Sequence, residues 1–517
     1  MAWFPGLNLP HPNPISTRIL WRVARGTGIA SLTFGLLTSC TVGPDYVPPK
    51  LNLPAGFTEP FSTRAETTKH AEKLDDAWWM SFGDVTLDEL MSRAQQSAPD
   101  LTEAAARLRE VRAWRNIAGA AAYPAVAAGA QYARTHGSAN VPVGVPPGGL
   151  GPGADGNLWQ SGFDASWELD VFGARRRTVE AADASYQATA ADLDNVKLTL
   201  LAEIARNYIE LRGNQRQQSV ALENLSIQQD ALALTRSQFN AGLASSLDVL
   251  RAEALVSDTE AALPSFKANA HAAIYRIATL VGVAPEQLPS LLDEPKAIPR
   301  SVEDIPIGLT SDLLRRRPDI RAAERRIAAE NARIGIATAD LYPHFSLTSA
   351  VGLESLNAGT VLSAPSRYLS VGPSIDWLIF DAGKVRFEIH AAQARTDQAS
   401  AAYQRTVLNA LAEVETALVS YAQSEVRADR LAREVATERD VVTIATRLYR
   451  QGLEDFLSVL DSERSLYVAD DKLAQSERDK ALARVALYKA LGGGWQDPAN
   501  RREDRVPVEF GAVVPGP

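Results

Sequence analysis

The clearest candidate for covalent chemistry in this chain of 517 residues is the thiol of Cys40, its only cysteine. Because there is no second cysteine, the chain cannot form an intramolecular disulfide. The residues before Cys40 include several arginines, then a mostly apolar run (28–37), then Thr38 and Ser39. This order of basic, apolar and small residues is typical of a secretory signal peptide, here 1–39. We therefore expect Cys40 to become the first residue of the mature chain.

The four residues LTSC (37–40) resemble the lipobox of bacterial lipoproteins, in which an aliphatic and two small residues precede the cysteine that is acylated. An ordinary signal peptide that is cleaved near a cysteine is the alternative. We favour acylation because Cys40 is the only cysteine and lies at this position. Thr41 follows it in place of an aspartate, which resembles the pattern of lipoproteins sent to the outer membrane.

The other reactive side chains form no recognisable catalytic or metal site. The six histidines are scattered, and the sequence lacks HExxH, GxSxG and G-x-x-x-x-G-K-[ST] motifs. The net charge of −9 argues against nucleic acid as a partner. We interpret the short basic runs 175–177 and 315–317 as solvated faces or helix-end charges. The sequence thus predicts no enzyme, no metal site and no cofactor other than the lipid on Cys40.

One segment of fifteen residues occurs twice. FNAGLASSLDVLRAE begins at Phe239 and YRQGLEDFLSVLDSE begins at Tyr449, and six positions are identical at an offset of 210 residues. The shared glycines, Gly242 and Gly452, suit the left-handed position at which a helix ends. A helical turn needs only the glycine, so the repeated leucine and valine pattern after it predicts an additional function for both turns.

Long helices are predicted on both sides of these turns. The chain has 29 prolines, yet none lies in 153–263 or in 374–497, and proline is poorly tolerated inside helices. Apolar residues from Val407 onward recur at alternating steps of four and three, as in a coiled coil. Continuous helices over 173–240 and 383–450 would each be about 100 Å long.

The residues before each long helix alternate between apolar and polar side chains. Segments 163–171, 345–353 and 369–379 place apolar residues on one face and mostly small or acidic residues on the other. This period of two predicts β-strands. Strands of about ten residues with one apolar and one polar face suit a membrane barrel with a wet interior. A half-buried sheet of a soluble protein is the alternative, and the expected acyl anchor favours the barrel.

The repeat extends over most of the chain. Segment 99–124 matches 318–343 at an offset of 219 residues, and the Pro/Gly-rich stretch 141–156 is predicted to be a long exposed loop. The expected segments are the signal peptide 1–39; a lipid-anchored extended segment 40–82; repeat 1 over 83–282, with a first helix, strands at 120–136 and 158–172, a long helix 173–240 and a return helix 245–282; a connecting segment 283–311; repeat 2 over 312–492, with a first helix, strands at 342–354 and 368–380, a long helix 383–450 and a return helix 454–492; and a poorly ordered tail 493–517.

Two repeats supply four strands, which are too few to close a barrel. Small membrane barrels begin near eight strands, and open sheet edges are not tolerated in lipid. Several copies of the chain must therefore share one barrel. The predicted fold class is an α+β membrane protein, with a shared β-barrel of four strands per chain continuous with an α-helical barrel of long coiled-coil helices.

With its motifs in this order, the chain resembles the TolC-type outer-membrane factors, in particular the NodT/OprM-like lipoprotein branch. The resemblance runs from LTSC-TVGPDYVPP (37–49) to ALGGGW (490–495) and rests mainly on CTVGPDY, the WELDVFG/WLIFDAGK pair and the duplicated turn. It implies a homotrimer with a twelve-stranded barrel in the outer membrane and a periplasmic tunnel of twelve helices. It also implies a passive exit duct of a tripartite efflux system, docked to a periplasmic adaptor and an inner-membrane pump, usually of the resistance-nodulation-division class.

The resemblance assigns roles to residues around the two turns. The residues expected to contact the adaptor are Gly242, Leu243, Gly452 and Leu453. The residues expected to form the periplasmic gate are Leu457 and Asp461, with Asp248 and Tyr449 holding the closed state through contacts between neighbouring helix pairs. A ring of leucines constricts and dewets a pore, and a ring of carboxylates concentrates cations; a solvated helix charge is the alternative for Asp461. Ser458 and Glu454 stand where the TolC pattern has an aspartate and an arginine, so one carboxylate ring remains.

Two other functions are compatible with some of these features. A lipid-anchored periplasmic coiled-coil scaffold would explain Cys40 and the long helices but would leave the strands and the Pro/Gly-rich loop without a role. An exit duct for type I secretion would use the same scaffold for polypeptides. No residue in the sequence specifies the exported substrate.

Overall fold

The computed structural model describes residues 41–51, 54, 56–57, 77–140, 155–301, 305 and 310–495. The predicted signal peptide, Cys40, most of the Pro/Gly-rich loop and the tail beyond Trp495 lie outside these residues. The elements follow the chain in the order η2 (Trp78–Phe82), α2 (Val85–Ser97), α3 (Pro99–Ala120), β1 (Ala125–His136), β2 (Asp155–Leu169), α4 (Ala174–Asn240), α5 (Ser246–Val281), η3 (Pro285–Gln287), α6 (Pro289–Leu292), α7 (Thr310–Arg316), α8 (Pro318–Ala339), β3 (His344–Ser355), η4 (Ala364–Ser366), β4 (Arg367–Asp376), α9 (Lys384–Arg450) and α10 (Phe456–Ala490).

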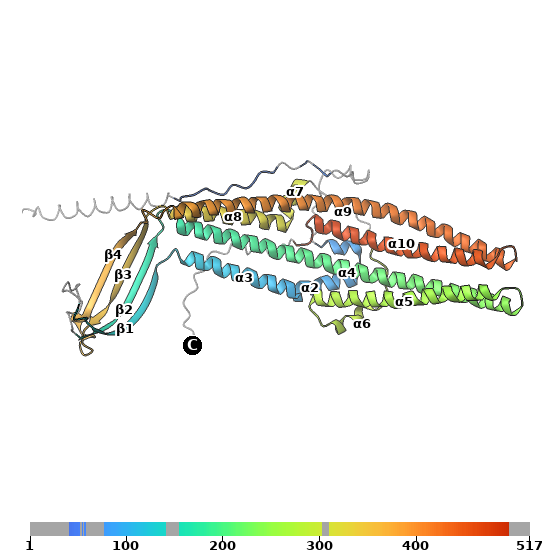
Figure 1. The fold of residues 1–517 in the computed structure, drawn as a ribbon, viewed down its shortest axis with the longest axis horizontal. Coiled ribbons are helices and arrows are strands. Elements are labelled where there is room, and N and C mark those ends of the chain that lie inside the picture. Colours follow the sequence, from blue (N-terminus) through green and yellow to red (C-terminus); the bar gives the residue numbers. More distant parts are fainter. Residues whose placement is uncertain are drawn as a thin grey trace, which may run out of the picture. The chain divides into compact units, whose positions relative to one another are not determined.

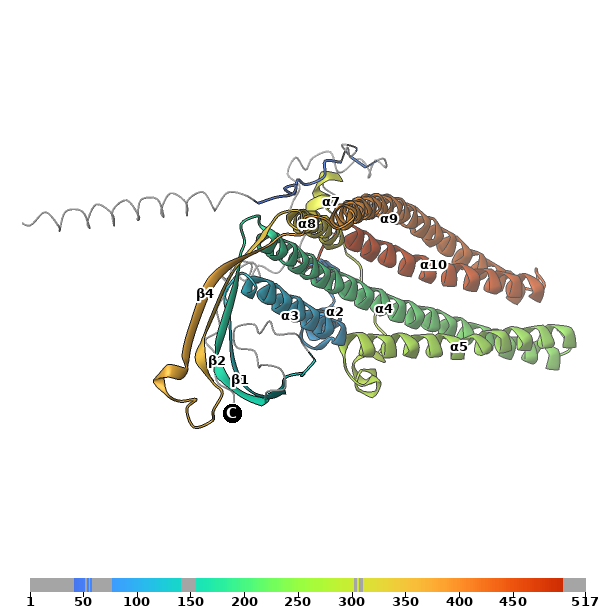
Figure 2. The same cartoon turned by 60° about the vertical axis from the view of Figure 1, so that its left-hand side comes forward.

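The chain divides into two compact units. The first contains all four strands, which form one antiparallel sheet in the order β1-β2-β3-β4 (Figure 2). Gly162 and Gly352 are paired at the centre of this sheet, where the hydroxyl of Tyr368 would lie 3.1 Å from a Cβ added to Gly162. The glycines therefore leave room for the tyrosine ring. The ring in turn covers the glycine backbone, which has no side chain to shield it.

The strands differ from the predicted ranges at several ends, and pairing explains the differences. β1 begins at Ala125 because α3 continues to Ala120 and a turn ending in Pro124 separates the two. β2 starts earlier than expected, since Asp155 pairs with His136. β4 stops at Asp376, the partner of the first residue of β3, so the residues after it have no strand beside them in the described chain.

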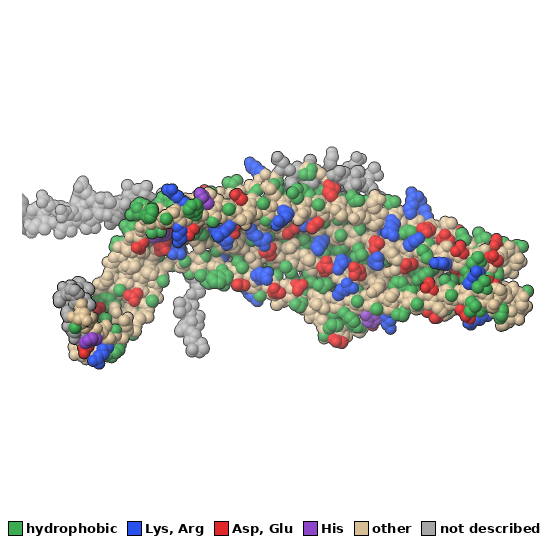
Figure 3. Space-filling view, in the orientation of Figure 1, with side chains coloured by type: hydrophobic (Ala, Val, Ile, Leu, Met, Phe, Trp, Pro, Cys, Tyr) green, Lys and Arg blue, Asp and Glu red, His purple; other side chains and the backbone are tan. Residues whose placement is uncertain are grey.

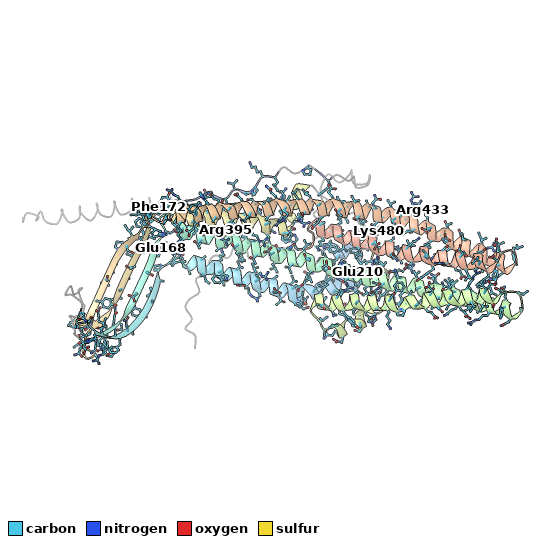
Figure 4. The ribbon with its side chains drawn as sticks, viewed as in Figure 1. Glu168, Phe172, Glu210, Arg395, Arg433 and Lys480 are labelled. Carbon is cyan, nitrogen blue, oxygen red and sulfur yellow. The ribbon has the colours of Figure 1, made fainter. Side chains whose placement is uncertain are left out.

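Two helical hairpins make up most of the second unit. In one, α4 meets α5 at the turn of Gly242, and in the other α9 meets α10 at the turn of Gly452 (Figure 1). α4 and α9 each contain 67 residues, which corresponds to a length of about 100 Å. Ion pairs join the antiparallel helices of a hairpin, as in the contact between Lys480 of α10 (Figure 4) and Glu425 of α9 at 3.0 Å.

The first helix of each predicted repeat is broken in two. α2 ends at Ser97 and α3 begins at Pro99, and in the second repeat α7 ends at Arg316 and α8 begins at Pro318. The residue before a proline is disfavoured in the helical conformation, whereas proline itself suits the first position of a helix. One continuous helix in each repeat was therefore the wrong prediction, and the two prolines mark the breaks.

A large hydrophobic core holds the second unit together. Trp78 is buried and stacks on Tyr488 of α10, with ring centroids 5.0 Å apart. Buried aliphatic side chains from α2, α4, α5 and α10 surround this pair. Within the core, the fully buried guanidinium of Arg212 donates to the carbonyl oxygens of Leu292 at 3.3 Å and Glu294 at 2.7 Å. Arg212 thereby ties the segment that follows α5 to the middle of α4.

The basic runs are not uniformly solvated. Arg177 and Arg317 are only 3% and 7% exposed, so the interpretation of the runs as solvated faces was wrong for these two residues, although both lie at helix ends. Arg317 donates to Asp319 and to Glu413, both at 2.7 Å. A buried cation is tolerated when it is paired and hydrogen-bonded in this way.

Acidic and basic side chains are interspersed along the visible faces of the helices (Figure 3). Of the helices in the described residues, none has both the length and the apolar character needed to span a membrane.

Candidate functional site

The two predicted tip turns have the same geometry. The backbone angle φ is 75° at Gly242 and 72° at Gly452, a left-handed conformation that glycine adopts without strain. The amide of the following leucine donates to a carbonyl oxygen five residues earlier, at 2.9 Å for Leu243 and 3.0 Å for Leu453, which closes the helix end. Both leucine side chains stay in solvent, 80% and 69% exposed. Each turn is thus a fixed backbone that presents an exposed apolar side chain.

The helix after each turn begins at a capped residue. Asp248 and Ser245 form a capping box at the start of α5, in which the Asp248 carboxylate accepts from the Ser245 amide at 3.0 Å. Asp455 caps α10 by accepting from the amide of Ser458 at 3.0 Å. The Ser458 hydroxyl also donates to Glu454 at 3.0 Å. The two residues that depart from the TolC pattern, Ser458 and Glu454, are therefore bonded to each other in the second turn.

The predicted gate residues Leu457 and Asp461 lie four residues apart on α10, which places them on the same face of the helix. Leu457 is 50% exposed and Asp461 is exposed, whereas Val459 and Leu460 between them are buried. Both gate residues therefore point away from the chain's own core, and the role of this face in a pore stays a prediction.

Tyr449 links the two hairpins. Its hydroxyl, at the end of α9, donates to the side-chain oxygen of Gln238 at the end of α4. Burial raises the pKa of Tyr449, and the negative charge of Asp248 raises it further. Asp248 therefore lies near enough to act on the tyrosine electrostatically while its carboxylate serves the cap of α5. Within one chain, the hydrogen bond of Tyr449 goes to Gln238 and those of Asp248 go to Ser245.

Around Tyr449 lies a small hydrophobic cluster that the sequence analysis did not identify. We call it the tip cluster. The Tyr449 ring lies 5.3 Å from that of Phe456, centroid to centroid. All four hairpin helices contribute to the cluster, which therefore holds the two hairpins together. Its buried members are Leu232, Ala252, Val256, Phe456, Val459 and Leu460, packed against Leu225, Val249, Leu255, Ala445 and Tyr449.

Two buried polar side chains lie on the same helices, one between the cluster residues Leu225 and Leu232 of α4 and the other three residues after Leu460 of α10. Glu463 of α10 and Gln228 of α4 are 5% and 2% exposed. Neither amide atom of Gln228, nor one carboxylate oxygen of Glu463, has a hydrogen-bond partner among the described residues. Burial raises the pKa of Glu463 to about 7. A carboxyl group in this environment is stabilised in its protonated form.

The repeat in the sequence contains a signal for this buried carboxyl group, which was not among the predicted site residues. Glu463 repeats Glu253 at the offset of 210 residues. Glu253 accepts from Arg236 across the first hairpin at 2.7 Å. At the same offset, Thr446 stands in the place of Arg236. The second copy thus keeps the acid and lacks its cation.

Among the residues that the structure describes, no three histidine, cysteine, aspartate or glutamate side chains lie together in a way that could hold a metal ion. Covalent acylation of Cys40 falls outside these residues and stays a prediction.

Comparison with known proteins identifies the family of the chain. The family described as "Outer membrane efflux protein" matches residues 90–283 and 309–493. The chain is 31% identical over 466 residues to Nodulation protein T of Rhizobium leguminosarum bv. trifolii, with 90% of this chain and 96% of that protein covered. It is 32% identical over 456 residues to the Pyoverdine export outer membrane protein OpmQ of Pseudomonas putida, with 87% and 94% covered.

Solved structures share the fold. The outer-membrane channel OprN is 39% identical, with a TM-score of 0.82 over 89% of this chain and 100% of that chain. This likeness confirms the predicted TolC-like fold of four antiparallel strands and long helices in two repeats, and the family match confirms the prediction of a channel component in place of an enzyme. The chain belongs to the outer membrane efflux protein family and is a TolC-type outer-membrane channel of an efflux system.

Proposed function

We propose that three copies of the chain assemble into one exit duct, with a barrel of twelve strands, three times the four of one chain. The observation that carries this proposal is the open sheet. In the described chain, β1 and β4 each have a neighbouring strand on one side only. Unpaired strand edges are not tolerated in lipid, and a ring of identical contacts between copies would pair them all.

The apolar residues of the edge strands support a lipid-facing surface. Leu369, Val371 and Ile375 of β4 are 74%, 63% and 62% exposed, and Val126 of β1 is 69% exposed. A soluble protein rarely leaves such a band uncovered. The outward face of a membrane barrel is the environment in which these side chains would be buried.

The proposed partners follow from the same architecture. The turns with exposed Leu243 and Leu453 are the proposed docking points for a periplasmic adaptor, through which an inner-membrane pump of the resistance-nodulation-division class supplies the energy. An acyl chain on Cys40 would anchor the protein in the outer membrane with its helices in the periplasm. The pyoverdine export function in the name of one relative favours small organic molecules over polypeptides as the exported substrates.

Replacing Asp461 with asparagine is expected to lower the cation-to-anion permeability ratio of the channel about fivefold, because it removes a ring of carboxylates that concentrates cations at the gate. The ratio would be measured as the reversal potential of purified protein in a planar bilayer under a salt gradient. Asp440→Asn, which neutralises an exposed carboxylate on α9, is the matched control.

Two results of this experiment would contradict the proposal. A protein that inserts and conducts nothing would support the scaffold function in place of the duct. A permeability ratio of Asp461→Asn equal to that of Asp440→Asn would show that Asp461 does not face the pore.

A further inference from the structure

The residues that directly follow the proposed acyl acceptor are bound to the place where strands meet helices. We call residues 41–45 the strap. The amide of Val42 donates to the carbonyl oxygen of Phe172 at 3.1 Å, and Phe172 lies at the junction of β2 and α4 (Figure 4). The side-chain amide of Asn331 on α8 donates to the carbonyl oxygen of Pro44 at 3.0 Å. The strap is therefore held from two elements of the first unit.

Arg177 of α4 is the centre of this contact. Its Nε donates to the carbonyl oxygen of Val42 at 3.2 Å. Its Nη2 donates to the carbonyl oxygen of Gly43 at 3.2 Å and to the carboxylate of Asp45 at 2.8 Å. Its Nη1 donates to Glu180 on the same helix at 2.7 Å. The side chain of Arg177 is only 4% exposed, so the guanidinium is committed to the strap and to one carboxylate that orients it.

Glycines on both sides leave room for this contact. Gly43 has a φ of 87°, and a Cβ added to it would lie 2.5 Å from Cα of Gly335 on α8. A Cβ on Gly335 would lie 2.8 Å from Cγ of Arg177, and one on Gly173 would lie 2.7 Å from the methyl group of Thr41. The backbone of the strap at Gly43, the backbone of α8 at Gly335 and the side chain of Arg177 therefore lie too close together for a side chain at either glycine. Thr41, Val42, Gly43 and Asp45 of the CTVGPDY motif are the residues that make these contacts.

We propose that the clamp formed by Arg177, Gly335 and Gly173 is a positioning device for the acyl anchor, which fixes the height of the lipid attachment relative to the sheet. This inference rests on the proposed acylation of Cys40. In the sequence, Cys40 directly precedes Thr41, the first residue of the strap. The acyl chains of all subunits then enter the bilayer at the same level, beside the strand ends, which brings the edges of β1 and β4 of neighbouring copies to a common depth.

The clamp can be tested in the full-length lipoprotein in lipid nanodiscs by measuring the distance between two nitroxide labels. Suitable label sites in the first unit are Val47→Cys, which is 73% exposed, and Arg333→Cys on α8, whose side chain is 47% exposed. Labelled chains are diluted with unlabelled ones so that distances within one chain dominate. The test variants are Arg177→Met and Gly43→Ala, and the control is Gly119→Ala, where an added Cβ meets no atom within 4 Å.

We expect one narrow distance in the parent and in Gly119→Ala, and loss of that peak in both test variants. We also expect both test variants to lose yield of the heat-modifiable oligomer in the outer-membrane fraction. Because Arg177→Met can also disturb α4, Gly43→Ala, which leaves Arg177 in place and acts at the contact between the strap and α8, is the deciding variant. A narrow peak in Gly43→Ala would overturn the clamp, and a lost peak with a parental oligomer yield would overturn its positioning role. The mass of the N-terminal peptide tests acylation separately, since an unmodified Cys40 would overturn the anchor and leave the distance result readable.

Discussion

Replacing Tyr449 with alanine is expected to raise the open probability of the channel about 100-fold. The variant loses the hydrogen bond to Gln238 and the packing on Phe456 within the tip cluster. A net hydrogen bond contributes about 1 kcal/mol and partial burial of an aromatic ring about 2 kcal/mol, which together correspond to two orders of magnitude. Single-channel recordings of the purified protein in a planar bilayer would measure this change.

Two further variants separate the contributions at this position. Tyr449→Phe keeps the ring and loses only the hydroxyl, so we expect a rise in open probability of about fivefold. Tyr275→Ala removes a tyrosine that is 45% exposed on α5, and its open probability should equal that of the parent. If Tyr449→Ala opens no more often than Tyr275→Ala, separation of the hairpins at the tip cluster is not the opening step.

Replacing Glu463 with glutamine is expected to remove most of the pH dependence of hairpin packing between about pH 5 and pH 7. Burial raises the pKa of Glu463 from 4.5 to about 7, so the packed arrangement binds a proton more tightly than a solvated carboxyl group does. Packing is therefore strongest below pH 4.5, weakens as the pH rises to about 7, and stays at its weaker level above that. The shift corresponds to about 3 kcal/mol.

Hydrogen exchange of α4 amides around Gln228, followed across this pH range and corrected for intrinsic rates, would measure the effect. Gln228 lies between the tip-cluster residues Leu225 and Leu232 of α4, and Glu463 lies on α10 between Leu460 of that cluster and Asp471, which accepts from Gln217 of α4 at 2.7 Å. Glu253→Gln is the control, because its carboxylate is solvated and paired with Arg236. An equal pH slope in the parent and in Glu463→Gln would show that Glu463 does not titrate in the packed state.

The parts of the fold that depend on local chemistry could be predicted from the sequence. The left-handed turns at Gly242 and Gly452 follow from glycine beside a repeated apolar pattern, because few other residues adopt that conformation. The long helices follow from the proline-free stretches, and the strands follow from their alternating faces. Each of these features follows from the order of residues along one stretch of chain, so distant contacts are not needed to recognise it.

The features that depend on which residues meet across the chain could not be predicted. Arg177 reads as a solvated charge in its own helix, and only the strap, more than a hundred residues earlier, makes it a buried ligand. Glu463 and Glu253 are equivalent in the repeat, yet one is buried and the other is paired in solvent. The first copy has Arg236 to pair with its glutamate, whereas the second copy has Thr446 at the equivalent position. That these positions face each other across a hairpin is known only from the folded structure.

The central claim is that β1 of one chain pairs with β4 of the next, and disulfide cross-linking tests it most directly. Chains with one cysteine at Ala128 of β1 and one at Leu369 or Val371 of β4 would be oxidised in outer membranes. An Ala165→Cys/Ser349→Cys pair, which is in register between β2 and β3 of one chain, is the control that cross-links within a monomer. The account predicts a covalent species of three chains that forms no longer ladder. Monomers alone, or an open ladder of dimers and higher species that does not end at three chains, would contradict it.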